Sequence, residues 1–172
     1  MELTADIIEG FVGSCLAKNF HNAVASPAAH KEWWELCCSK DKYVAIAAPR
    51  GHAKSTAITG AFVLASILFR VANYVIILSD TEGQATLFLN DIKKELIEND
   101  DIIQLFGVEK IEKDQETDII VRMTDGNRFR IQAKGSEQRV RGLKWRNQRP
   151  DLIVGDDLEN DEIVMNPDRR DK

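Results

Sequence analysis

The sequence has few cysteines and no long apolar run. Each of these two absences excludes a class of protein. Cys15 and the adjacent pair Cys37 and Cys38 have no metal-ligand spacing, and three is an odd number for a disulfide framework. We expect them to pack in the interior. No apolar stretch reaches about eighteen residues, and the start lacks the basic and apolar regions of a secretory signal. We expect a soluble, intracellular protein without a membrane segment.

An overall excess of positive charge is also lacking. The formal net charge is -5, whereas dedicated nucleic-acid-binding domains are usually basic. The charge is uneven, because Lys134 to Arg149 holds six cations and one acid, Glu137, and the stretch from Asp151 to Glu162 is strongly acidic. A basic segment that runs into an acidic one suits phosphate chemistry beside a metal site. A solvated charged surface is the alternative.

Length and hydrophobic content favour one domain. The 172 residues, 44% of them hydrophobic, suffice for one sizeable core but not for two comfortable domains. Residues 1–40 form a helical preface, because Ile7, Ile8 and Phe11 have helical spacing and Ser26 is placed to cap a second helix over residues 27–38. Residues 41–172 follow as the core.

Alternating apolar runs and helical patterns predict an α/β fold beyond the preface. Short unbroken apolar runs, typical of strands buried on both faces of a parallel sheet, occupy residues 43–48, 74–78 and 152–155. Helical patterns occupy residues 54–70 and 81–98, the second with Thr81 as its cap. Residues 118–123 and 128–133 read as a hairpin around Asp125-Gly126. We predict a three-layer domain with a mainly parallel central sheet and a β-hairpin insertion.

A phosphate-binding loop is expected between the first strand and the helix after it. Residues 48–56 read Ala-Pro-Arg-Gly-His-Ala-Lys-Ser-Thr. Lys54 would reach the β- and γ-phosphates, and Ser55 would supply a hydroxyl for Mg²⁺. Ala48 and Ala53 replace both glycines of the usual pattern G-x-x-x-x-G-K-[ST], and we expect a nearly helical backbone at Ala53, which alanine tolerates. An ordinary strand-to-helix turn with a solvated lysine is the alternative.

Two carboxylates end the last predicted strand. Asp156 is the candidate Mg²⁺ ligand, and Asp157 or Glu159 is the candidate for orienting or deprotonating an attacking water, with Glu162 more distant. An acidic, solvated helix start is the alternative. The loop and the acidic strand end each follow a buried strand, and parallel sheets place ligands at that edge, so together they favour nucleotide binding.

Three segments together resemble the ATPase domain of the terminase large subunit of tailed phages, namely residues 49–56, 135–142 and 156–159. Proteins of that family have a P-loop NTPase fold of the ASCE type, assemble as a ring at the capsid portal and drive double-stranded DNA inward. The resemblance implies that residues 1–172 form the N-terminal ATPase domain, with ATP and Mg²⁺ as cofactors. It also implies double-stranded DNA, a portal protein, a small terminase subunit and further copies of the chain as partners, in the cytoplasm of the host cell.

Carried over by position, the resemblance gives roles to single residues. The nucleotide-binding residues would be Arg50, Gly51, His52, Ala53, Lys54, Ser55 and Thr56. Ser55 and Asp156 would hold Mg²⁺, and Arg50 would contact or sense the γ-phosphate. Arg141, or alternatively Arg139, would reach the nucleotide of a neighbouring subunit and stabilise charge on the transferring phosphoryl group. A surface role or a DNA-phosphate contact is the alternative for these arginines.

The resemblance also bears on the base and on turnover. The family holds adenine with a segment upstream of the first strand, here residues 20–34, where at most one of Trp33 and Trp34 would stack on the base. It places the later strands of the motor core and the nuclease domain beyond Lys172. We therefore expect the isolated chain to hydrolyse ATP weakly or not at all.

Other functions fit parts of the same pattern. A two-domain helicase uses a similar loop and acidic strand end, but it needs a second motor domain. A nucleotide-binding assembly module without turnover agrees with the alanines at 48 and 53. A small-molecule kinase is disfavoured, because the stretch after the second strand offers no lid or acceptor site.

Overall fold

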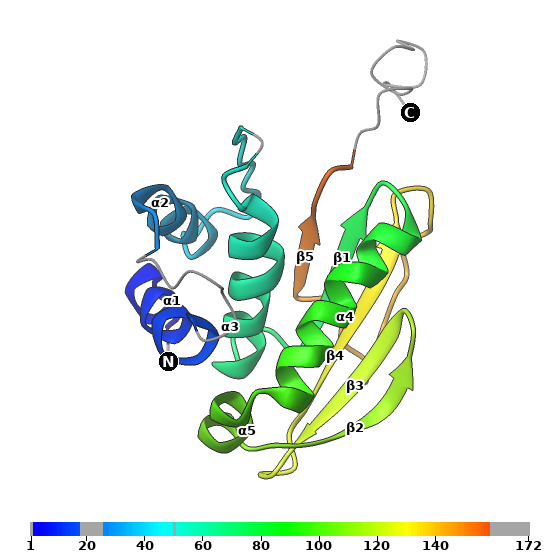
Figure 1. The fold of residues 1–172 in the computed structure, drawn as a ribbon. Helices are drawn as coiled ribbons and strands as arrows, with labels where there is room; N and C mark the ends of the chain where they lie inside the picture. Colours follow the sequence, from blue (N-terminus) through cyan, green and yellow to red (C-terminus); the bar gives the residue numbers. More distant parts are fainter. Residues whose placement is uncertain (1, 18–25, 50, 159–172) are drawn as a thin grey trace.

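The computed structural model describes residues 2–17, 26–49 and 51–158 (Figure 1). Its elements, in chain order, are α1 (Ala5–Phe11), η1 (Val12–Leu16), α2 (Ala28–Cys37), η3 (Thr56–Phe62), α3 (Val63–Leu68), β1 (Tyr74–Ser79), α4 (Glu82–Glu98), α5 (Asp100–Phe106), β2 (Val108–Gln115), β3 (Asp118–Met123), β4 (Arg128–Gly135) and β5 (Leu152–Gly155). The α/β class predicted from the sequence is confirmed.

The strands form one mixed sheet in the order β2-β3-β4-β1-β5. β4 and β5 run parallel to β1 on either side of it, whereas β2 and β3 are antiparallel additions. The predicted hairpin is confirmed as β3 and β4, with Gly126 at φ 85° in its turn. The sequence analysis missed β2, since its residues are mostly polar and its pairing with β3 shifts register twice.

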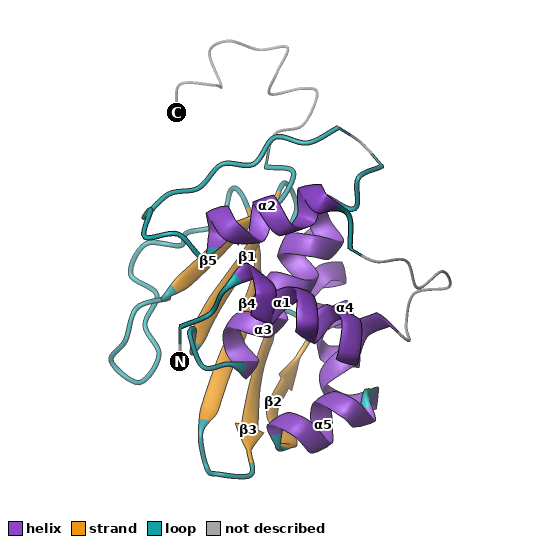
Figure 2. Cartoon of the chain, turned by 90° about the vertical axis from the view of Figure 1, so that its left-hand side faces the viewer, coloured by secondary structure: helices purple, strands orange, loops and turns teal. Residues whose placement is uncertain are grey.

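Helices cover one face of the sheet. Val75 and Ile77 of β1 pack into the hydrophobic core with α3 and α4, while Tyr74, between strands β4 and β5, belongs to the opposite face. Figure 2 shows the described helices together on one side of the strands. The predicted third layer is therefore not among the described residues. No described helix has both the length and the hydropathy needed to cross a membrane.

The N-terminal helices pack against the helix that follows residues 51–55. Thr4 caps α1 by accepting a hydrogen bond from the Ile7 amide, and α2 starts after Pro27 instead of being capped by Ser26. Trp34, in α2, is 1% exposed and donates its indole N–H to the carbonyl of Ala57 in η3 at 2.9 Å. The predicted helical preface thus packs directly on the core.

The predicted first strand does not form. Residues 43–48 belong to no strand, and Tyr43 is 85% exposed. A groove of about 210 Å³ separates this segment from β5, with Val44 and Ile46 on one wall and Ile153 on the other. A strand requires a neighbour that satisfies its backbone N–H and C=O groups, and none of the described strands pairs with this segment.

Candidate functional site

The carboxyl ends of three parallel strands meet at one edge of the sheet. The Asp156 amide donates to the Leu78 carbonyl at 2.9 Å, and the Asp80 amide donates to the Asp157 carbonyl at 3.1 Å. The Ser136 hydroxyl, just after β4, donates to the Asp80 carbonyl at 3.1 Å. This is the edge at which open α/β sheets bind ligands.

Asp156 is the buried acid of this edge, with 3% of its surface exposed. Its Oδ2 accepts a hydrogen bond from the hydroxyl of Thr59 at 3.1 Å, and its carbonyl accepts one from Ser79 at 2.9 Å. Its Oδ1 lies 3.2 Å from Nζ of Lys54, which is an ion-pair distance, but no donor among the described residues has hydrogen-bonding geometry toward it. One oxygen of a buried carboxylate is therefore left with acceptor capacity.

Lys54 joins the loop to the acidic strand end. Its Nζ lies 3.2 Å from Asp156 Oδ1 and 3.4 Å from Asp157 Oδ1. Partial burial lowers the pKa of Lys54, but the close ion pair with Asp156, followed by the charge and hydrogen bond of Asp157, outweighs it and holds the pKa above its ordinary value. Lys54 is a fixed cation at this edge, as phosphate binding requires.

The loop backbone ahead of Lys54 is left-handed at two positions. Gly51 has φ 86° and Ala53 has φ 53°. The expectation of a nearly helical backbone at Ala53 was wrong. Left-handed φ is the conformation for which glycine is suited and alanine is strained, which accounts for the glycine of the usual pattern at this place.

The other loop residues divide between two sides of the helix start. His52 is exposed, and its carbonyl lies 2.8 Å from Nε2 of His30. Ser55 and Thr56 line a separate cavity of about 610 Å³ that also contacts Phe88 and Ile92 of α4. No contact in the described part of the chain joins Ser55 to Asp156, so Ser55 as a Mg²⁺ ligand stays a prediction.

The candidate water-orienting acids and arginines are less fully placed. Asp157 is exposed and left-handed, at φ 47°, beside Lys54. Glu159 and Arg50 lie outside the described residues. Arg139 and Arg141 are exposed in the connection between β4 and β5, and within the described ranges neither contacts Lys54 or Asp156.

Thr59 was missed by the sequence analysis. It is 1% exposed, and it reaches Asp156 from the first turns of the helix after the loop. A lone threonine within a helical pattern carries no distinctive signal, so its role is seen only through its contact with Asp156. Trp33 and Trp34 are both buried in the core, so adenine stacking by either is not supported. His30 packs against both rings.

The chemistry of the site fits one divalent cation with a nucleotide. Mg²⁺ is usually held by one or two carboxylates together with substrate phosphates and water. The free acceptor of Asp156 is suited to this, and Lys54 beside it is suited to phosphate. In the ligand-free structure Lys54 neutralises the same carboxylate that would face the ion.

Comparison with protein-family models, with curated proteins and with solved structures gives no match.

Proposed function

We propose that the chain is an Mg²⁺-dependent ATP-binding and ATP-hydrolysing domain, the motor of a viral DNA-packaging terminase that moves double-stranded DNA into a procapsid. The observation that carries the nucleotide part is the contact of Lys54 with buried Asp156 at the carboxyl edge of β5. The resemblance of the three segments carries the packaging part. This function would be performed in the host cytoplasm, in a ring with portal protein and the small subunit.

The residues of the edge would act as follows. On nucleotide binding Lys54 leaves Asp156 and Asp157 and pairs with the β- and γ-phosphates, because phosphate oxygens carry more charge than one carboxylate. Asp156 would hold Mg²⁺ through Oδ1, and the ion would supply neutralisation of charge on the phosphates. Thr59 holds the other oxygen in place.

The remaining roles complete a phosphoryl transfer to water. Asp157 or Glu159 orients the attacking water, and Arg50 contacts the γ-phosphate. Arg141 or Arg139 of a neighbouring copy stabilises charge on the transferring group, so the isolated chain turns over slowly. Slow turnover also follows from Ala53, whose strained backbone and Cβ narrow the space for phosphate.

Calorimetry with ATP and Mg²⁺ tests the nucleotide part directly. We expect binding by the chain and at least tenfold weaker binding by Lys54→Ala, with Lys40→Ala, an exposed cation elsewhere, binding normally. Equal binding by Lys54→Ala and the unchanged chain would remove the proposal. A circular-dichroism melt of each variant shows that the comparison is between folded proteins.

A binding module without turnover is the second candidate, favoured by the left-handed alanine in the loop. Phosphate release by the chain at high concentration, with and without duplex DNA, separates the two. Phosphate release per chain that rises with chain concentration, as a subunit-to-subunit arginine requires, supports the motor. Tight ATP binding with no release under any of these conditions supports the module.

A further inference from the structure

The connection between β4 and β5, residues 136–150 and called the basic loop below, gathers exposed positive charge. Its exposed cations are Arg139, Arg141, Lys144, Arg146 and Arg149. Glu137 is the one acid within it. None of these five cations forms an ion pair with any residue in the described ranges.

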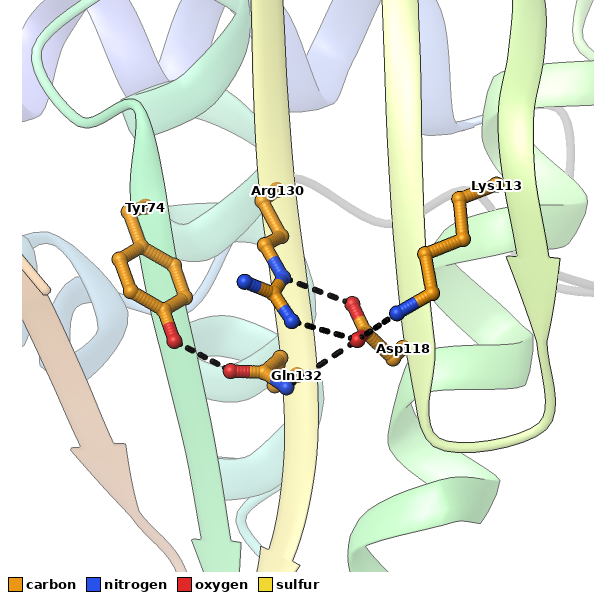
Figure 3. Close-up of polar contacts among 5 residues, drawn as sticks. All are labelled: Tyr74, Lys113, Asp118, Arg130 and Gln132. Atoms are coloured by element: carbon orange, nitrogen blue, oxygen red, sulfur yellow. Dashed lines mark hydrogen bonds and ion pairs between the residues drawn. The ribbon is translucent and has the colours of Figure 1, made fainter. Parts of the chain in front are cut away.

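Four of the six cations in strands β2 to β4 are instead paired with acids, and only Lys110 and Lys134 have no ion pair among the described residues. The guanidinium of Arg130 donates two hydrogen bonds, of 2.9 and 2.6 Å, to the carboxylate of Asp118 (Figure 3). Lys113 forms an ion pair with the same carboxylate. Arg128 pairs with Glu112 in the same way, through bonds of 2.5 and 2.9 Å. Most of the positive charge of these strands is thus paired within the fold, whereas that of the basic loop is unpaired in the described chain.

The tip of the basic loop is held in shape. Trp145 and Gln148 exchange two backbone hydrogen bonds of 2.9 Å, and the two residues between them, Arg146 and Asn147, are left-handed at φ 50° and 65°. Left-handed values at both central positions define a tight two-residue turn that projects its tip. Arg146, one of the exposed cations, thus has a strained left-handed backbone at the tip of the turn.

Trp145 anchors this turn to the sheet. The rings of Trp145 and Tyr74, in β1, pack edge to face with their centroids 6.1 Å apart. The Arg146 guanidinium lies 5.7 Å from the centroid of the Trp145 ring. Because these contacts occupy the ring, Trp145 is not an open platform on which unpaired bases would stack, as single-strand binders require. Exposed, unpaired cations without a stacking surface fit the regular phosphate rows of a duplex.

We propose that the basic loop is the surface by which this chain contacts the phosphate backbone of a nucleic-acid duplex. This inference rests on the proposed function for the choice of duplex DNA, but the charge, exposure and shape of the loop do not depend on the nucleotide site. Lys144, Arg146 and Arg149 would contact phosphates, and Asn147 at the tip adds a neutral donor. The contact reads no sequence, since phosphates are the same at every step.

The test compares two triple variants that each remove three positive charges. One is Lys144→Ala, Arg146→Ala and Arg149→Ala in the basic loop, which leaves Arg139 and Arg141 intact. The matched control is Lys40→Ala, Lys94→Ala and Lys110→Ala, three exposed cations without ion pairs elsewhere in the described chain. Fluorescence anisotropy with a labelled duplex DNA measures affinity over a range of salt concentrations.

We expect the loop variant to bind at least tenfold more weakly than the unchanged chain at about 0.1 M salt, and its plot of log affinity against log salt to be less steep by about 2 to 3. The affinity of the control variant should stay within about threefold of that of the unchanged chain. Its salt slope should differ from that of the unchanged chain by less than about 1. Equal losses in the two variants would overturn the proposal, as would tighter binding of a single strand or of heparin than of duplex. So would a lack of binding by the unchanged chain at low salt.

Failure of the two proposals can be told apart. ATP binding is measured on the same loop variant, which keeps Lys54 and Asp156 and should bind ATP normally. Normal ATP binding with unchanged duplex affinity contradicts the basic loop alone. Loss of duplex affinity in a chain that never binds ATP contradicts the proposed function alone. Thermal unfolding of each variant confirms that the loop substitutions leave the fold intact.

Discussion

Ala53 is a residue whose side chain and backbone conflict. It has φ 53°, a region that costs residues with a Cβ roughly 1 to 2 kcal/mol and costs glycine little. We expect Ala53→Gly to stabilise the chain by about 1 kcal/mol, after allowance for the extra freedom of glycine in the unfolded state. Urea unfolding measures this. Ala47→Gly, in an exposed segment where φ is not positive, should give no gain, and a loss of stability in Ala53→Gly would contradict the assignment.

The hydroxyl of Thr59 supports the Asp156 carboxylate. Valine has nearly the same size as threonine but lacks that hydroxyl. Thr59→Val removes the hydroxyl that donates to Asp156 at 3.1 Å and leaves a buried carboxylate with one partner fewer. We expect a loss of about 1.5 to 3 kcal/mol in unfolding free energy, as for hydrogen bonds to charged groups, together with weaker ATP·Mg²⁺ binding. Ser66→Ala is the matched control. It removes a buried hydroxyl that donates to the Phe62 carbonyl, away from the site, so it should leave ATP affinity unchanged.

Among the elements, strands β2 to β4 are tied together by one buried acid. Asp118 is 5% exposed and accepts hydrogen bonds from Arg130, Lys113 and Gln132. Burial raises the pKa of Asp118, but the hydrogen bonds and charges of Arg130 and Lys113 outweigh it and hold the pKa below its ordinary value. The ionised form of Asp118 therefore stabilises the folded sheet.

We expect Asp118→Asn to destabilise the chain by about 2 kcal/mol at neutral pH. Because the folded pKa is lowered, this stabilisation is fully present above the unfolded pKa of about 3.9 and is lost as pH falls through the folded value. The difference between the two chains in unfolding free energy should shrink below about pH 4. Asp114→Asn, whose exposed carboxylate pairs with Lys93, should cost less than about 1 kcal/mol. A difference that grows on acidification would contradict this account.

At the scale of the whole molecule, a bound nucleotide would join two halves of the fold. The site is shared between the helix after the phosphate loop and the end of β5. At a hundred times its dissociation constant, a ligand stabilises the folded chain by about 2.7 kcal/mol, which corresponds to a rise in Tm of roughly 5 to 10 °C for a domain of this size. We expect this rise in Tm with ATP and Mg²⁺ in a thermal melt. The rise should be smaller with ATP when EDTA replaces Mg²⁺, and ATP with Mg²⁺ should give no rise in Lys54→Ala. A rise of the same size in Lys54→Ala would place the ligand elsewhere.

The parts predicted correctly from the sequence have local causes. The β3–β4 hairpin follows from Asp-Gly between strand-like runs, and the α4 cap follows from Thr81, whose hydroxyl accepts from the Gln84 amide. Asp156 follows a strand, β5, as predicted, whereas Lys54 reaches it from the helix start and not from the end of a strand, because residues 43–48 form none.

The parts predicted wrongly or missed depend on tertiary surroundings. Residues 43–48 have the composition of a strand, but pairing depends on a neighbour that the run itself does not encode. The left-handed φ of Ala53 contradicts the preference of alanine, so the residue type gave no signal for it. Thr59 became visible only when Asp156 was placed beside it, since a lone threonine in a helix has no distinctive signal.

The edge-on packing of Trp145 on Tyr74 makes the basic loop optically visible. Of the three tryptophans, Trp33 and Trp34 are buried, and Trp145 is the most accessible to solvent. Iodide is an anionic quencher, and the cations around Trp145 draw it toward that ring before either of the others. Intrinsic fluorescence quenched by iodide therefore reports on this loop without any label, and any partner that covers the loop restores the emission.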